Sequence, residues 1–187
     1  LTSSQRVGHA NQKLRDQGYT DDFDRWFAAK CGLPLSPGAD PVPPMFTPYQ
    51  LRGMTLANRV VVSPMCTYSA EDGLPTDFHL VHYGSRGLGG AGLIVTEMTC
   101  VADDARITPG CAGIWNDAQQ QAWKRIVEFI HRNGNAKVSL QIGHAGRKGA
   151  TRLAWDAIDM PLQAGGWPLL APSPLPYIPG TSQAPKE

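Results

Sequence analysis

The amino-acid sequence predicts an α/β chain that forms the first part of a (β/α)8 barrel. Short apolar strands are expected at 60–63, 93–97 and 137–141, and helical patterns lie between them at 79–87 and 116–133. Strands that alternate with helices favour a parallel sheet with right-handed crossovers. A polar cluster follows each strand: SPMCTYS, EMTCV and QIGHAGRKG. Because ligand chemistry in parallel α/β folds gathers at the carboxyl ends of the strands, these clusters favour a barrel over an open sheet.

The length limits how much of a barrel is expected. The chain has 187 residues, of which 42% are hydrophobic and 18% charged. That is enough for one sizeable core and a small second unit. A complete barrel takes eight strands and about 250 residues, so residues 45–187 are expected to supply only about three β/α units, the N-terminal part of the barrel.

Residues 1–44 are expected to be the tail of a preceding domain and a linker. The stretch TDDFDRWFAAKCG predicts a short amphipathic helix with Phe23, Trp26 and Phe27 on one face. A single helix cannot bury such a face by itself. The stretch LPLSPGADPVPP has five prolines in twelve residues, which prevents a regular helix or strand and predicts a domain boundary near Pro44.

The stretch GLGGAG, residues 87–92, has the G-x-G-x-x-G spacing of a dinucleotide-binding turn. Such a turn follows a strand and opens a helix, because the pyrophosphate lies against free N–H groups of the helix. Here a helical stretch, DFHLVHYGSR, precedes the glycines and a β-branched run, LIVTEM, follows them. This order favours a helix stop, where glycine takes the left-handed conformation after the last turn.

Residues that cap a helix, and residues that end a helix or strand, predict the remaining elements. Two short extended pieces flank Arg52 and Gly53 ahead of the first apolar strand. The second helix has Asn116 or Asp117 as its cap and Gly134 as its stop. The proline-rich stretch WPLLAPSPLPYIPGTSQAPKE is expected to be a loop.

Composition argues against several kinds of partner. The formal net charge is +1 and basic and aromatic residues do not interleave, so no nucleic-acid partner is expected. No apolar run approaches the ~20 residues of a membrane span, and the N-terminal stretch LTSSQRVGHANQKLRDQGY has no apolar core of a signal peptide. No membrane contact and a cytoplasmic location are therefore expected.

The cysteines and histidines do not form a metal-binding pattern. The four cysteines show no C-x-x-C spacing and are expected to be free thiols. His79 and His82 lie three apart, but no nearby ligand set completes them, so no metal is expected. At the end of the second strand, Glu97 could act on a substrate, although a hydrogen-bonded structural role is favoured.

Four motifs occur in an order and spacing typical of one enzyme family. They are NRVVVSPM, HYGSRGLGGAGLIVTE, RITPGCAGIWND and QIGHAGRK. Over residues 45–187 the chain resembles the N-terminal half of the Old Yellow Enzyme family of FMN-dependent oxidoreductases. The resemblance implies a TIM barrel, FMN and NAD(P)H as cofactors, a small-molecule substrate and an ene-reductase type of reaction.

A narrower resemblance concerns GCAGIWNDAQQQAWKRIV and GWPLLAPSPLPYIPG. These stretches resemble the C-terminal flavin module of the bifunctional salicylyl-CoA 5-hydroxylase and 2-aminobenzoyl-CoA monooxygenase/reductase proteins. In those proteins an FAD monooxygenase domain precedes the barrel, which would explain residues 1–44 and the stretch SQRVGHANQKLRD. The implied role is aromatic degradation on an aryl-CoA thioester.

The resemblance also implies flavin contacts. The residues it assigns to FMN are Ser63, Pro64, Met65 and Cys66 along the ring, Gly87 at the ring edge and Gln141 on the pyrimidine portion.

Two of the side chains in the first cluster are candidates for the catalytic set. Cys66 could tune the flavin through its polarisable sulfur, the alternative being an ordinary buried thiol. Tyr68 could donate a hydrogen bond to a substrate carbonyl, the alternative being a packed aromatic ring.

Two other interpretations stay open. One is a stand-alone Old Yellow Enzyme-type reductase of small enones, for which the helix at 20–32 would have little use. The other is a scaffold that binds no flavin alone, because the family's substrate-anchoring pair, catalytic acid tyrosine and phosphate site are expected beyond Glu187. The 187 residues alone are accordingly expected to be inactive, and a homo-oligomer stays open.

Overall fold

The computed structural model describes residues 16–186. The chain divides into two compact units between Arg59 and Val60. Most of the stretch SQRVGHANQKLRD, which the sequence assigns to a preceding domain, lies outside the described residues.

The first described element is helix α2, Gln17–Lys30. It begins earlier than the sequence predicts, because the Asp16 side chain caps it by accepting the Tyr19 N–H at 3.1 Å. The aromatic face is also not the buried one. Asp24 and Ala28 are buried, whereas Trp26 is 54% exposed. Phe23 is exposed as well, in agreement with the expectation that this helix cannot bury its aromatic face by itself.

A short hairpin completes the first unit. After the 3₁₀ turn η1, Pro44–Phe46, strand β1, Tyr49–Leu51, pairs antiparallel with β2, Met54–Leu56. Arg52 takes a positive φ of 51° in the connecting turn. These strands confirm the two extended pieces expected on either side of Arg52 and Gly53.

Arg59 stabilises this unit from within. Its guanidinium lies 5.0 Å from the centre of the Phe27 ring and 4.9 Å from that of Tyr49, a cation–π geometry. It also donates to the Thr47 hydroxyl at 3.0 Å.

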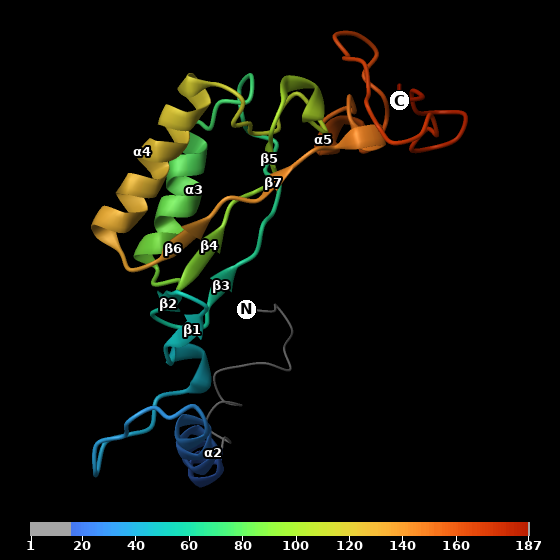
Figure 1. Cartoon of the computed structure of the whole chain (residues 1–187). Coiled ribbons are helices and arrows are strands. Elements are labelled where there is room, and N and C mark those ends of the chain that lie inside the picture. The colour runs from blue at the N-terminus through green and yellow to red at the C-terminus, as the bar shows by residue number, and fades with distance from the viewer. Residues whose placement is uncertain (1–15, 187) are drawn as a thin grey trace. The chain divides into compact units, whose positions relative to one another are not determined.

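The second unit contains the predicted β-α-β-α-β segment. Strands β3, Val61–Val62, β4, Leu93–Val95, and β6, Lys137–Ser139, form a parallel sheet in the order β3-β4-β6. Helices α3, Asp77–Leu88, and α4, Asp117–Asn133, connect them and lie side by side on one face of the sheet (Figure 1). The strands are shorter than predicted, but their order and direction are confirmed.

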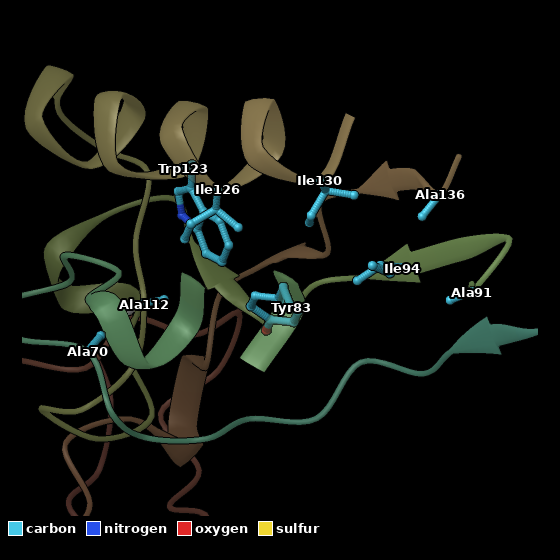
Figure 2. Packing of buried hydrophobic residues seen from close by; sticks show 9 residues of the cluster. All are labelled: Ala70, Tyr83, Ala91, Ile94, Ala112, Trp123, Ile126, Ile130 and Ala136. Carbon is cyan, nitrogen blue, oxygen red and sulfur yellow. The ribbon is translucent and has the colours of Figure 1, made fainter. Parts of the chain in front are cut away.

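The core lies between this helix pair and the sheet. Trp123, Ile126 and Ile130 of α4 point toward Tyr83 of α3 and Ile94 of β4 (Figure 2). All five side chains are at most 3% exposed. Burying each contributes about 1.5–3 kcal/mol, so this cluster is the main apolar stabilisation of the second unit.

The glycines of GLGGAG end helix α3. The helix stops at Leu88, Gly89 is its C-cap and Gly90 takes a left-handed φ of +87°. Gly92 then donates its N–H to the carbonyl of Val60 at 2.9 Å, just before β4 begins. The order helix, glycines, strand is confirmed, and no dinucleotide turn is formed here.

A separate two-stranded sheet follows the three-stranded sheet along the chain. Strand β5, Thr99–Cys100, pairs parallel with β7, Ile142–Gly143. The 3₁₀ turns η2, Asp103–Ala105, and η3, Gly146–Lys148, follow them, and the last helix is the single turn α5, Ala154–Ala157. The proline-rich C-terminal stretch is irregular, as predicted. Within residues 16–186, no helix is both long and apolar enough to cross a lipid bilayer.

Candidate active site

The carboxyl ends of β3, β4 and β6 meet at one edge of the sheet, because the three strands are parallel. Hydrogen bonds join the segments that follow them. Thr67 donates its N–H to the Glu97 carboxylate at 3.1 Å, and Thr99 donates its N–H to the carbonyl of Gln141 at 2.7 Å. The three polar clusters seen in the sequence therefore form one continuous edge.

Part of this edge is open and apolar. Met65 is 56% exposed and Ile142 is 63% exposed, and Gln141, the residue before Ile142, is exposed as well. Ser63 and Pro64 are also exposed, whereas Cys66 is half-buried. We call the exposed Met65 and Ile142 the apolar shelf; apolar side chains beside a side-chain amide suit a flat heteroaromatic ligand.

The Cys66 thiol lies at the inner end of this shelf. Burial raises its pKa, and the nearby Cys111 and Glu97 raise it further, while the nearby backbone of Met98 lowers it. Cys66 is therefore a neutral thiol at physiological pH. All four cysteines are free, as the sequence predicts.

Met98 is a site residue that the sequence analysis missed. Its backbone lies near the Cys66 sulfur, and its side chain lies against Gly143, where a Cβ atom would approach the Met98 Cγ to 2.8 Å. Met98 thus lies between two of the three strand ends. The sequence feature that could have indicated Met98 is its position directly after Glu97, at the end of an apolar strand.

Tyr68 has an unusual backbone conformation for a non-glycine residue, with φ at +52°. Its carbonyl lies so close to Gly110 that any side chain at that position would collide with it, and Ala70 donates its N–H to the Gly110 carbonyl at 3.0 Å. Burial raises the pKa of Tyr68, and the nearby Cys66 adds to the rise. The half-buried hydroxyl therefore remains protonated and can donate a hydrogen bond.

Gly87 does not belong to this edge. It lies in the last turn of α3, where a Cβ atom would come 3.1 Å from the Ile130 Cγ2, and Gly134 packs against its carbonyl. Because α3 leads back to the start of β4, its last turn lies near the amino ends of the strands. The absence of a side chain at Gly87 is explained by helix packing, and the structure does not bring it to the other predicted flavin residues.

Glu97 lies behind the open shelf and is fully buried. Its carboxylate accepts the Thr67 N–H and hydroxyl at 3.1 and 2.8 Å, and the Tyr83 hydroxyl at 3.3 Å. Burial alone would raise its pKa, but the donors of His79 and Thr67 outweigh burial, so the pKa of Glu97 is lowered. The structural role favoured by the sequence is confirmed.

His79 is the other fully buried polar residue of this network. Its Nδ1 accepts the Thr76 N–H at 3.0 Å, so the neutral ring carries its proton on Nε2, which faces Glu97 Oε1 at 3.2 Å. Across residues 16–186, no group of three or more His, Cys, Asp or Glu side chains is arranged to hold a metal ion.

A parallel β/α sheet with an open carboxyl edge is the arrangement of part of a β/α barrel, the class of protein in which ligands bind at the strand ends. Residues 44–165 match the NADH:flavin oxidoreductase / NADH oxidase family, and the chain belongs to this family. Proteins of the family use FMN together with NAD(P)H. The resemblance to Old Yellow Enzyme drawn from the motifs is confirmed at the level of the family.

Two curated relatives show the extent of the similarity. The chain is 40% identical over 146 residues to an NADH:flavin oxidoreductase of Gibberella zeae, which covers 76% of this chain and 35% of that protein. It is 50% identical over 106 residues to an NADPH dehydrogenase of Listeria monocytogenes serotype 4a, covering 56% of this chain and 31% of the relative. The chain thus spans about a third of the length of these relatives.

Solved structures agree with this assignment. Morphinone reductase superposes with a TM-score of 0.62 at 31% identity, covering 76% of this chain and 38% of that protein. Old Yellow Enzyme from Pichia sp. AKU4542 gives a TM-score of 0.60 at 32% identity, with coverages of 71% and 32%. The fold is that of part of a TIM barrel, as the strand order predicts.

Proposed function

We propose that this chain carries the N-terminal flavin-facing part of an NAD(P)H-dependent FMN oxidoreductase of the Old Yellow Enzyme type. The observation that supports this most directly is the single open edge formed by three parallel strand ends, in a chain that belongs to a flavin oxidoreductase family. Bound FMN would supply the chemistry of accepting and passing on a hydride.

The residues at the edge suit this cofactor. The exposed residues Ser63 and Pro64 and the side chain of Met65 would lie along the ring, with Ile142 extending the apolar shelf. The Gln141 amide would hydrogen-bond the pyrimidine portion. Met98 would take the close contact that the sequence analysis gave to Gly87, since Met98 lies between Cys66 and Gly143.

Cys66 and Tyr68 would act on the ligands rather than hold the fold. The neutral Cys66 thiol is polarisable and would tune the flavin. The Tyr68 hydroxyl, kept protonated by burial, would donate a hydrogen bond to a carbonyl oxygen of a small-molecule substrate.

For the substrate we propose an aryl-CoA thioester, processed in a bifunctional protein with an FAD monooxygenase domain ahead of the barrel. This rests on the motif resemblance and on helix α2, which precedes the family match and exposes Trp26 and Tyr19, the latter at 70%. Exposed aromatic side chains on one helix are typical of a surface that packs on another domain. Reduction of small enones by a stand-alone enzyme is the alternative.

The test is the flavin content of the purified full-length protein. Released FMN together with FAD, and NAD(P)H oxidation stimulated by an aromatic acyl-CoA, would support the bifunctional enzyme. FMN alone, with turnover of small enones, would support the alternative. A colourless protein that does not take up added FMN would overturn the proposed function.

A matched pair of variants tests the site itself. Gln141→Leu should weaken FMN binding by about tenfold, the effect of losing one or two hydrogen bonds to the ring. Gln121→Leu, on the exposed face of α4, should leave FMN affinity unchanged. Equal affinities of the two variants would remove Gln141 from the site.

A further inference from the structure

The end of β4 holds the segment that follows β3 through one side chain. Glu97 accepts both the backbone N–H and the hydroxyl of Thr67. Thr67 directly follows Cys66, and the Met98 backbone lies near the Cys66 sulfur. Two hydrogen bonds therefore set the position of Thr67, and with it that of Cys66, against the end of β4.

Helix α3 holds Glu97 from behind. The Glu97 N–H donates to the Tyr83 hydroxyl at 2.7 Å, and this hydroxyl in turn lies 3.3 Å from Oε1. His79 approaches the same oxygen at 3.2 Å. Glu97 and His79 are both 0% exposed, so the contact of this network with the segment after β3 is made by Thr67, which follows Cys66.

Burying a carboxylate is energetically unfavourable. Removing it from water costs several kcal/mol, which the surrounding donors must offset. An apolar side chain could fill the same space at lower cost, but it could not accept two hydrogen bonds from Thr67. The gain from the carboxylate at this place is therefore the fixed geometry of the segment that it holds.

We propose that Glu97 is a positioning residue that directs the Cys66 thiol at the flavin edge by fixing Thr67, with His79 and Tyr83 holding Glu97 in place. The inference deepens the proposed flavin function and rests on it for its catalytic consequence. The positioning of Cys66 itself can be measured without any flavin.

The first experiment measures alkylation of Cys66 by iodoacetamide in the flavin-free full-length protein, followed by peptide mass spectrometry. The exposed Cys31 serves as the internal reference. Glu97→Gln should raise the Cys66 rate about fivefold relative to Cys31, because a loosened segment exposes its thiol more often and because the lost charge no longer raises the thiol pKa. Thr67→Val keeps that charge and removes one of the two Thr67 hydrogen bonds, so it should raise the rate by less and reports the loosening alone.

Two controls separate positioning from general damage. Thr67→Ser keeps both hydrogen-bond donors to Glu97, so Cys66 should be alkylated at the wild-type rate. Asp24→Asn removes another buried carboxylate, in the first unit, and should leave Cys66 unchanged. A wild-type Cys66 rate in Thr67→Val would overturn the proposal, whether or not Glu97→Gln folds or changes the rate.

The second experiment measures the midpoint potential of bound FMN in a double-mutant cycle. If Glu97 acts through the thiol, Glu97→Gln should shift the potential in the wild-type background and lose that shift in the Cys66→Ala background. If the potential still shifts in the Cys66→Ala background, the charge of Glu97 acts on the flavin directly and not through the thiol. That result would overturn the proposal that Glu97 acts by positioning Cys66. Failure of the wild-type protein to bind FMN would instead contradict the proposed function, while the alkylation rates would still decide whether Glu97 positions Cys66.

Discussion

The apolar face and the carboxyl edge of the second unit are both built on helix α3, yet they are held together by different forces. Toward α4 the helix presents Gly84 and Gly87, which let Phe129 and Ile130 approach closely. Toward the strand ends it presents His79 and Tyr83, which contact a buried carboxylate. The packing toward α4 is stabilised by close apolar contacts, and the region at the strand ends is stabilised by hydrogen bonds and charge. The two regions should therefore respond differently to substitution and to pH.

The largest expected effect comes from the apolar region. Trp123→Ala removes a buried ring and its Nε1–H bond to the Gly113 carbonyl. It should lower the free energy of unfolding by about 3–5 kcal/mol. Denaturant unfolding monitored by circular dichroism measures this loss, and Val81→Ala, on an exposed position of α3, should change the stability by less than about 0.5 kcal/mol. Similar losses for the two variants would contradict the assigned core.

Glu97→Gln should destabilise less, by about 1–3 kcal/mol, because the amide keeps the shape but cannot accept every hydrogen bond offered to the carboxylate. The same unfolding measurement at neutral pH gives this value. Asp103→Asn, which alters an exposed ion pair with Arg106, is the control and should be nearly neutral. A neutral Glu97→Gln would show that the buried network adds no stability.

The pH dependence should separate the two regions most clearly. The pKa of Glu97 is lower in the folded chain than its ordinary value of 4.5. Its stabilisation is therefore present above that value and is lost as pH falls through the lowered pKa of the folded state. The stability difference between wild type and Glu97→Gln should shrink as pH is lowered from 7 to below 4.5, while the effect of Trp123→Ala should stay constant. Parallel pH profiles for all three proteins would refute a charged Glu97.

The smallest effect is expected for Gly87→Ala. The added methyl group would meet Ile130 at 3.1 Å, which offsets the gain of about 0.5–1 kcal/mol from replacing a helical glycine. The net change in stability should stay within about 1 kcal/mol, and FMN affinity should not change. An FMN titration that shows markedly weaker binding would return Gly87 to the flavin site.

The order and type of the elements could be predicted because they depend on local signals. Asn116 caps α4 by accepting the Gln119 N–H, and Gly90 ends the turn after α3. Such contacts lie within a few residues, so the sequence contains them directly. That the polar clusters after the strands meet at one edge could likewise be predicted, because parallel strands bring their carboxyl ends together.

The partners of the site residues could not be predicted in the same way. Thr67 and Glu97 are thirty residues apart, and no local pattern shows that their side chains meet. Gly87 was misplaced because a glycine in a helix can serve either close helix packing or close ligand approach, and only the position of Ile130 decides between them. Met98 was missed because its contact to Cys66 is made by the backbone, which every residue has.

The close approach of Gly110 to the Tyr68 carbonyl has a consequence for how this sequence can vary. Position 110 lies in a loop, where substitution is ordinarily tolerated, yet here even a methyl group would displace the backbone beside the candidate donor. As far as folding is concerned, Tyr68 could be replaced by other aromatic residues, whereas any side chain at position 110 would collide with the Tyr68 carbonyl. In a saturation library scored for folded protein, the glycine should therefore be less replaceable than the tyrosine.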